Sequence, residues 1–245
     1  MRVTFDSNAW EVVFDAPNER YRGVRQAVSE ARIEAYICEI GFRIEAIRKI
    51  DRRNYFSQPH FGVTFGGPQP HSDGKMALFM SMGPKDELHP GVPSQQRTKL
   101  HYAFESGAKL LRAQAWMGLP SPPELRNPEV FLSDLGIPDR EGKQILAAHA
   151  IEQRGFGKKL FDEIGGWSLD ASTNVDEKKF QKACAEWADG ETVAAHVAYG
   201  VDILCTNDCA KSSTKSIFSC EGRSWLESEY RVKFMTLDEL QSALG

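Results

Sequence analysis

Apolar and polar residues alternate in a short segment at the N-terminus. The segment RVTF (residues 2–5) has the two-residue period of a β-strand, and the largely apolar IEAYIC (residues 33–38) is a second strand candidate. Between them, residues 21–31 place their apolar side chains on one side of a helix, and residues 40–50 again have the spacing of an amphipathic helix. This strand–helix–strand–helix order predicts a parallel sheet that is covered by helices.

A similar pattern returns in the last third of the chain. A helix of small residues, ETVAAHVAY, leads through a glycine into the apolar strand DILC, which ends in the polar triplet TND. Residues 233–235 form a further candidate strand, and Thr236 has the position of an N-cap before the short helix LDELQSAL. Other helices are predicted at residues 140–153, 156–164 and 176–187.

Between these two regular parts the pattern breaks down. Residues 57–100 are dense in glycine and proline, and residues 101–117 are predicted as one helix that ends before a PSPPEL stretch. We interpret residues 55–140 as an α-rich insertion, because they contain few strongly apolar periodic segments. The sequence therefore predicts one α/β domain over residues 1–245: a three-layer sandwich whose central, mostly parallel sheet has helices on both faces.

Composition sets limits on partners and location. The 245 residues are 41% hydrophobic and 26% charged, as in ordinary globular proteins, and the net charge of −4 provides no overall basic field for nucleic acid. The five cysteines form no CxxC pair, which argues against a zinc site and suits a reducing compartment. No segment has the character of a signal peptide or a membrane span, so we expect a cytoplasmic protein without a membrane partner.

Four acidic residues are expected at one edge of the predicted sheet. Asp6 and Asp208 follow strands, and the carboxyl ends of parallel strands meet at the edge where α/β proteins bind ligands. Asp189 is expected at the beginning of the helix that feeds the DILC strand, and Glu45 lies in the early turns of the helix after the second strand. Taken singly, each acid also has a structural interpretation as a helix cap, a turn residue or a solvated helix residue.

Carboxylates that converge in this way repel one another. Like charges roughly 4 Å apart cost several kcal/mol at an intermediate dielectric constant, so such a group has to share protons or bind cations. Oxygen ligands without an accompanying histidine or cysteine favour Mg²⁺ or Mn²⁺. Since divalent ions can activate water and stabilise charge on a scissile phosphate, the acids predict a metal-dependent nuclease.

Three segments resemble those of PIN-domain ribonucleases. The segment DGETVAAHVAYGVDILCTND, residues 189–208, is similar to the family's run of an acid, a small-residue helix, a glycine, an apolar strand and T-x-D. The segment VTFDSNAW resembles the opening strand and its Asp, and AYICEIGFRIEAIRKIDR resembles the second strand with a helix-borne Glu. These segments lie at the two ends of the chain, and the predicted insertion separates them.

The resemblance implies an endoribonuclease that hydrolyses phosphodiester bonds of RNA. It implies that Asn8 and Thr206 are supporting polar groups at the substrate, while Glu39 and Glu191 remain open as replacements for two of the assigned acids. RNA, or alternatively DNA, is the implied partner, and a homodimer and an antitoxin-like inhibitor also remain open. The implied catalytic residues, which are also the implied ligands of Mg²⁺ or Mn²⁺, are Asp6, Glu45, Asp189 and Asp208.

Basic residues flank the expected acidic edge. Arg48 belongs to a basic cluster on the helix that carries Glu45, and Lys211 follows Asp208. We predict that Arg48 and Lys211 contact the phosphate backbone, although solvated helix faces carry the same pattern. His196 is interpreted as a buried, hydrogen-bonded side chain rather than a general acid or base.

Two other functions are compatible with the same residues. One is a nuclease that acts on DNA or on structured junctions, which a comparison of RNA and DNA cleavage separates from a ribonuclease. The other is a non-catalytic PIN-like module that binds nucleic acid or protein. In that case the substitutions Asp6→Asn and Asp208→Asn leave binding intact, and there is no hydrolysis to lose.

Overall fold

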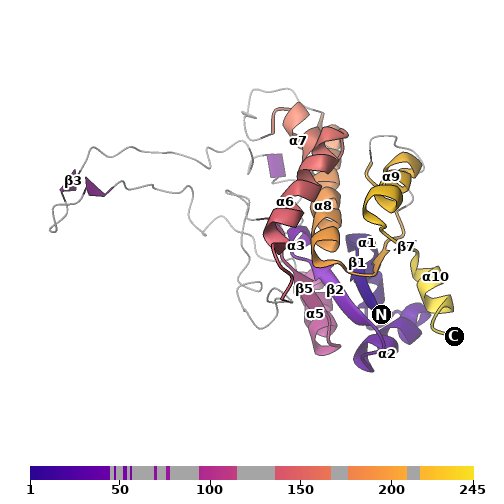
Figure 1. Ribbon diagram of the computed structural model, residues 1–245. Coiled ribbons are helices and arrows are strands. Elements are labelled where there is room, and N and C mark those ends of the chain that lie inside the picture. The colour runs from indigo at the N-terminus through magenta and orange to yellow at the C-terminus, as the bar shows by residue number, and fades with distance from the viewer. Residues whose placement is uncertain are drawn as a thin grey trace.

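The computed structural model describes residues 1–44, 47, 52–53, 56, 69–70, 76–77, 94–114, 136–166, 176–208 and 216–245. Its central sheet consists of the strands β1 (Arg2–Phe5), β2 (Glu34–Cys38), β5 (Lys109–Leu111), β6 (Ile203–Cys205) and β7 (Phe234–Met235). The strands lie in the order β5-β2-β1-β6-β7, and all neighbouring pairs are parallel. Helices lie on both faces of this sheet (Figure 1), which confirms the predicted three-layer α/β sandwich.

The strand order contains one reversal of direction. From β1 the chain continues to β2 and β5 on one side of the sheet, and it then crosses to the other side of β1 to form β6 and β7. The reversal therefore lies between β1 and β6, and open α/β sheets commonly bind ligands beyond the carboxyl ends of the two strands at such a point. Asp6 directly follows β1 and Asp208 closely follows β6, so both acids belong to this position.

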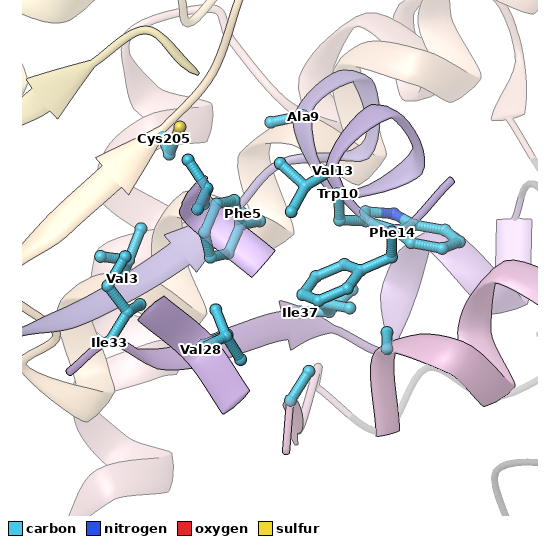
Figure 2. Close-up of a cluster of buried hydrophobic side chains, with 14 of the residues drawn as sticks. Val3, Phe5, Ala9, Trp10, Val13, Phe14, Val28, Ile33, Ile37 and Cys205 are labelled. Carbon is cyan, nitrogen blue, oxygen red and sulfur yellow. The ribbon is translucent and has the colours of Figure 1, made fainter. Parts of the chain in front are cut away.

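One face of the sheet is covered by helices from the first half of the chain and by the C-terminal helix. These helices are α1 (Ser7–Val13), η1 (Glu19–Tyr21), α2 (Arg22–Ser29), α5 (Ser94–Glu105) and α10 (Leu237–Ser242). Figure 2 shows how Phe5 and Ile37 of the sheet lie among Trp10, Phe14 and Val28 of this layer. The rings of Phe5 and Phe14 meet edge to face, with centroids 6.1 Å apart. This packing fixes the end of β1 and, with it, the backbone of the residue that follows.

The other face is covered by helices from the second half of the chain. These are α6 (Arg140–Gln153), α7 (Lys158–Glu163), α8 (Glu177–Tyr199) and α9 (Cys220–Tyr230), and the short α3 (Ile40–Ile44) follows β2. In Figure 1, α6 runs alongside α8. Phe161 of α7 and Trp187 of α8 stack with ring centroids 4.8 Å apart, and Phe56 lies fully buried beside them. This aromatic cluster holds α8 against its neighbours on the sheet.

The prediction of one helix over residues 101–117 was wrong. Helix α5 ends at Glu105, Gly107 follows with a φ of 98°, and β5 begins at Lys109 and pairs with β2. Strand β5 therefore belongs to the central sheet although it lies within residues 55–140, the range predicted as an insertion. Most of that range is outside the described residues, apart from α5, β5 and the antiparallel pair β3 (Gln69–Pro70) and β4 (Met76–Ala77).

The helix predicted at residues 176–187 and the helix ETVAAHVAY are one continuous element, α8. The helix continues without a break through Gly190, and this glycine allows close packing against a neighbouring segment. A Cβ atom added to Gly190 would lie 2.8 Å from the Cα atom of Gly157, which precedes α7. Neither α8 nor any other helix in the described segments combines the length and apolarity needed to cross a membrane.

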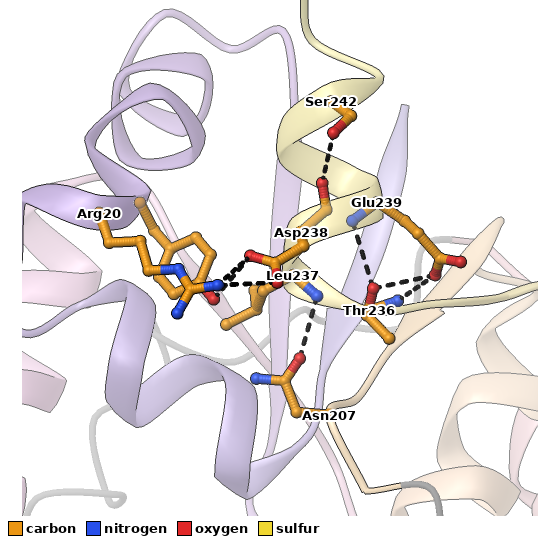
Figure 3. Close-up of polar contacts among 8 residues, drawn as sticks. Arg20, Asn207, Thr236, Leu237, Asp238, Glu239 and Ser242 are labelled. Atoms are coloured by element: carbon orange, nitrogen blue, oxygen red, sulfur yellow. Dashed lines mark hydrogen bonds and ion pairs between the residues drawn. The ribbon is translucent and has the colours of Figure 1, made fainter.

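The C-terminal helix is fixed at its first turn (Figure 3). Thr236 forms the predicted N-cap as part of a complete capping box with Glu239. Asp238 accepts hydrogen bonds from the guanidinium of Arg20 at 2.8 and 2.9 Å and from the hydroxyl of Tyr21 at 3.0 Å. The side-chain oxygen of Asn207 accepts the backbone N–H of Leu237 at 3.1 Å. Helix α10 is thereby tied to the polar triplet that follows β6.

Candidate active site

Asp6 lies at the N-cap position of α1, immediately after the central strand β1. Only 2% of the residue is exposed. One carboxylate oxygen, Oδ2, accepts a hydrogen bond from the hydroxyl of Thr206 at 2.9 Å and another from the amide of Asn8 at 2.8 Å. The other oxygen, Oδ1, is buried and has no hydrogen-bond partner among the described residues. Buried polar atoms without a partner are rare in folded proteins, so this oxygen marks a place where a ligand can bind.

The hydroxyl of Thr206 connects the two strands that meet at this point. It donates to Asp6 and accepts the backbone N–H of Asp208 at 3.1 Å and the side-chain amide of Asn8 at 3.3 Å. The side-chain oxygen of Asn8 in turn accepts the backbone N–H of Asn207 at 2.9 Å. Asn8 and Thr206, which were predicted as supporting polar groups, therefore orient the Asp6 carboxylate. Of the two, Thr206 is buried and Asn8 is exposed.

The environment of Asp6 raises the pKa of its carboxyl group to about 6. Burial is the largest cause, because removal from water disfavours the charged form. The negative charge of Asp208 raises this pKa further, whereas the hydrogen bonds from the Thr206 hydroxyl, the backbone N–H of Ser7 and the Asn8 amide lower it. The structure thus brings Asp6 and Asp208 close enough for electrostatic repulsion, as their positions after β1 and β6 predict.

Asp208 is half-buried at the beginning of the segment that leaves β6. Its backbone oxygen accepts a hydrogen bond from the guanidinium of Arg223, on α9. The same guanidinium lies over the ring of Phe234, 4.7 Å from its centroid, and its Nε donates to the backbone oxygen of Phe218 at 3.2 Å. The backbone of Asp208 is therefore fixed by two hydrogen bonds, one from Arg223 on α9 and one to the hydroxyl of Thr206.

The prediction that Asp189 begins a helix was wrong, because Asp189 lies half-buried in the middle of α8. Seven residues later on the same helical face, the imidazole of His196 makes a hydrogen bond of 3.0 Å with the hydroxyl of Thr4 in β1. Asp189 is about 10 Å from His196 along the helix axis, toward the carboxyl edge of the sheet, and Asp6 is about 7 Å from Thr4 in the same direction. Helix geometry therefore directs Asp189 toward the edge that carries Asp6.

His196 is buried, as predicted, and its pKa is lowered to about 4. The cause is burial, which disfavours the imidazolium form. With Thr4 as its partner, the imidazole remains neutral at physiological pH. This arrangement confirms the prediction of a buried, hydrogen-bonded histidine, and the bond to Thr4 joins α8 to β1.

The two alternative acids, Glu39 and Glu191, hold the chain where it leaves β5. Glu39 is 3% exposed and accepts the backbone N–H of Ala113 at 2.9 Å, while its other oxygen pairs with the guanidinium of Arg43 at 3.4 Å. Glu191 is 2% exposed and accepts the neighbouring backbone N–H, that of Gln114, at 3.4 Å. Both acids therefore have a structural task at the β2–β5 side of the carboxyl edge.

One acid of this region was missed by the sequence analysis. Glu186 of α8 is 5% exposed, accepts the backbone N–H of Ile217 at 3.3 Å, and has its pKa raised to about 7. Burial is the main cause, and the negative charge of Asp208 adds to it, while hydrogen bonds from Ile217 and Ser216 lower the pKa. The signal in the sequence is its periodicity: Glu186 follows Ala183 by three residues on the buried side of α8.

Comparison of the chain with known protein families, with curated proteins and with solved structures finds no match. The chemistry of the site therefore has to be inferred from its own residues.

Three of the predicted site residues, Glu45, Arg48 and Lys211, lie outside the described residues. In the segments that the structure does describe, no three His, Cys, Asp or Glu side chains are arranged as a metal-binding group. The pair Asp6 and Asp208 nevertheless fits a hard divalent cation, since both supply carboxylate oxygens and Oδ1 of Asp6 has no competing partner. Bound positive charge would relieve the repulsion that raises the pKa of Asp6.

Proposed function

We propose that this protein is a metal-dependent endoribonuclease that hydrolyses phosphodiester bonds in RNA. The observation that carries the proposal is the buried carboxylate of Asp6, whose Oδ1 has no hydrogen-bond partner among the described residues and which lies beside Asp208. The pair lies beyond the carboxyl ends of β1 and β6, where the strand order reverses. A functional site is the simplest reason for retaining such mutual repulsion in a folded protein.

Asp6 and Asp208 would hold Mg²⁺ or Mn²⁺ together, with Asp189 of α8 directed toward the same edge. A divalent ion bound there supplies an activated water and positive charge next to the scissile phosphate. Thr206 keeps the Asp6 carboxylate in place and leaves one of its oxygens available. Asn8 is exposed while its amide bonds Asp6, so it is available to contact a substrate at the same edge.

RNA is the proposed substrate because the residues at this edge are those through which the chain resembles PIN-domain ribonucleases. The order of the five parallel strands, with β1 in the centre, supports the comparison at the level of architecture. We also propose a cytoplasmic location, since the buried cysteines Cys38, Cys184 and Cys205 are all free thiols.

The test is an RNA cleavage assay with purified protein and a labelled single-stranded RNA, in Mg²⁺, in Mn²⁺ and in EDTA. We expect metal-dependent cleavage that falls at least ~100-fold in Asp6→Asn and in Asp208→Asn, because each substitution removes a charged ligand. Glu227→Gln, which removes one exposed charge from α9, is the matched control and should retain full activity.

The same assay separates the alternatives. If a DNA strand of the same sequence is cleaved at an equal or greater rate, the substrate is DNA rather than RNA, and the proposed metal site is unaffected. RNA binding without cleavage, unchanged by Asp6→Asn, would contradict the enzymatic proposal and support a binding module.

A further inference from the structure

The structure contains a polar cavity that is open to solvent and separate from the acidic edge. It has a volume of about 550 Å³ and lies between η1, α2 and α5. Both α2 and α5 end shortly before the strands β2 and β5 begin, so the cavity extends toward the amino edge of the sheet. Its lining includes Glu19, Arg22, Arg25, Gln26, Tyr102 and Ser106.

Arg25 in the wall of this cavity is a buried cation. The residue is 7% exposed, and its guanidinium donates to the backbone oxygen of Val13 at 3.0 Å. No acidic side chain among the described residues forms an ion pair with it. Burial of a charge is costly unless the charge is paired, and a hydrogen bond to a neutral carbonyl compensates this cost less than an ion pair does.

A second guanidinium faces the same cavity. Arg22 lies three residues before Arg25 and therefore on the same side of α2. Its side chain is 76% exposed and only 3.7 Å from that of Glu19, so the ion pair between them is accessible to water. Two arginines with planar donor groups on one wall are suited to bidentate binding of a phosphate or carboxylate group.

Two hydroxyl groups in the lining, one at the end of α2 and one directly after α5, offer hydrogen-bond acceptors. The hydroxyl of Ser106 donates to the backbone oxygen of Tyr102 at 2.8 Å, and the hydroxyl of Ser29 donates to that of Gln26 at 2.9 Å. Since their protons are engaged, both hydroxyls present lone pairs to the cavity. A ligand that also carries hydroxyl groups matches these acceptors.

We propose that this cavity binds a small hydroxylated molecule through a phosphate or carboxylate group, which neutralises Arg25. The volume lies within the range of about 300–1,000 Å³ that is usual for small-molecule sites. The site does not depend on the proposed nuclease activity, because it shares no residue with the acidic edge.

The test is isothermal titration calorimetry of the intact chain with inorganic phosphate, a 5′-mononucleotide and citrate as separate probes. We expect saturable one-to-one binding of at least one probe, weakened at least ~10-fold in Arg25→Gln, because a charge-assisted hydrogen-bond pair is lost. Binding of the phosphate probes alone identifies a phosphate ligand, and binding of citrate alone identifies a hydroxy acid.

Two further variants keep the outcome decisive. Arg22→Gln alters an exposed residue, should not impair folding, and should weaken binding several-fold. Arg32→Gln, an exposed arginine that pairs with Glu30 outside the cavity, should leave binding unchanged. The proposal is overturned if the folded protein binds none of the probes saturably, or if Arg25→Gln and Arg22→Gln bind as tightly as the unchanged chain.

Discussion

The substitution Asp6→Asn should increase the stability of the protein at neutral pH, although it should lower the proposed cleavage of RNA. Asn has the shape of Asp, and its oxygen can keep the hydrogen bonds from Thr206 and Asn8. Its nitrogen then takes the position of Oδ1, which has no hydrogen-bond partner among the described residues. The variant loses the buried negative charge and its repulsion by Asp208.

The size of the effect follows from the pKa of Asp6. Folding raises this pKa from 3.8 to about 6, and two units at ~1.4 kcal/mol each give a cost of roughly 3 kcal/mol for the ionised form. The folded state binds the extra proton, so stability falls as the pH rises from about 4 to about 6, and the full cost is present above pH 6. Amide hydrogens left without acceptors offset about 1–2 kcal/mol, which leaves a net gain of roughly 1–2 kcal/mol for the variant at pH 7.5.

Urea unfolding followed by tryptophan fluorescence at pH 4.0 and pH 7.5 measures this gain. The free energy of unfolding of Asp6→Asn, relative to that of the unchanged chain, should be higher at pH 7.5 than at pH 4.0. For Glu227→Gln this relative free energy should be the same at both pH values. Saturating Mn²⁺ at about 100 times its Kd should stabilise the unchanged chain by ~2.7 kcal/mol and the variant much less. The electrostatic account of the site is wrong if the stability difference between Asp6→Asn and the unchanged chain is the same at both pH values and Mn²⁺ stabilises the two proteins equally.

Substitutions at three further positions test other parts of the structure. Thr206→Val removes the hydroxyl that bonds Asp6 and should cost about 1–3 kcal/mol in urea unfolding, whereas Thr206→Ser should recover most of it. Gly190→Ala should cost about 1–3 kcal/mol in the same measurement, because its Cβ would lie 2.8 Å from the backbone of Gly157. The pKa of His196 falls to about 4 on folding, so its imidazole should remain neutral in NMR titrations down to about pH 5. The unchanged chain should therefore lose stability as the pH falls below about 6.5, and His196→Gln should lose less.

Elements with a strong local pattern could be predicted from the sequence. Strand β1 has strand periodicity, β2 is a largely apolar run, and the prediction of a helix at residues 140–153 coincides with α6. The capping box at Thr236 needs only residues that are close in sequence, so its prediction is confirmed in detail. The proximity of Asp6 and Asp208 followed from the parallel order of the strands alone.

The remaining features depend on contacts between distant segments. The sequence gives β5 only three residues, KLL, and they become a strand because they pair with β2; the Ser–Gly pair before them was the available sign that α5 ends. The two helices predicted at residues 176–187 and in ETVAAHVAY are one helix, because Gly190 remains helical and its small size allows the contact with Gly157. The periodicity of α8 places Glu186 on its buried side, but the hydrogen bond from Ile217 joins residues 31 positions apart and cannot be read from a local pattern.

The hydrogen bond between Thr206 and Asp6 joins residues 200 positions apart. A ribosome that adds about 5–20 residues per second needs roughly 10–40 s to progress from one to the other. During that interval the newly made Asp6 has neither Thr206 nor Asp208 beside it, so the growing chain cannot assemble the pair of carboxylates. Any property that needs both carboxylates, including the proposed cleavage of RNA, can therefore arise only after residue 208 has been made and β6 has paired with β1.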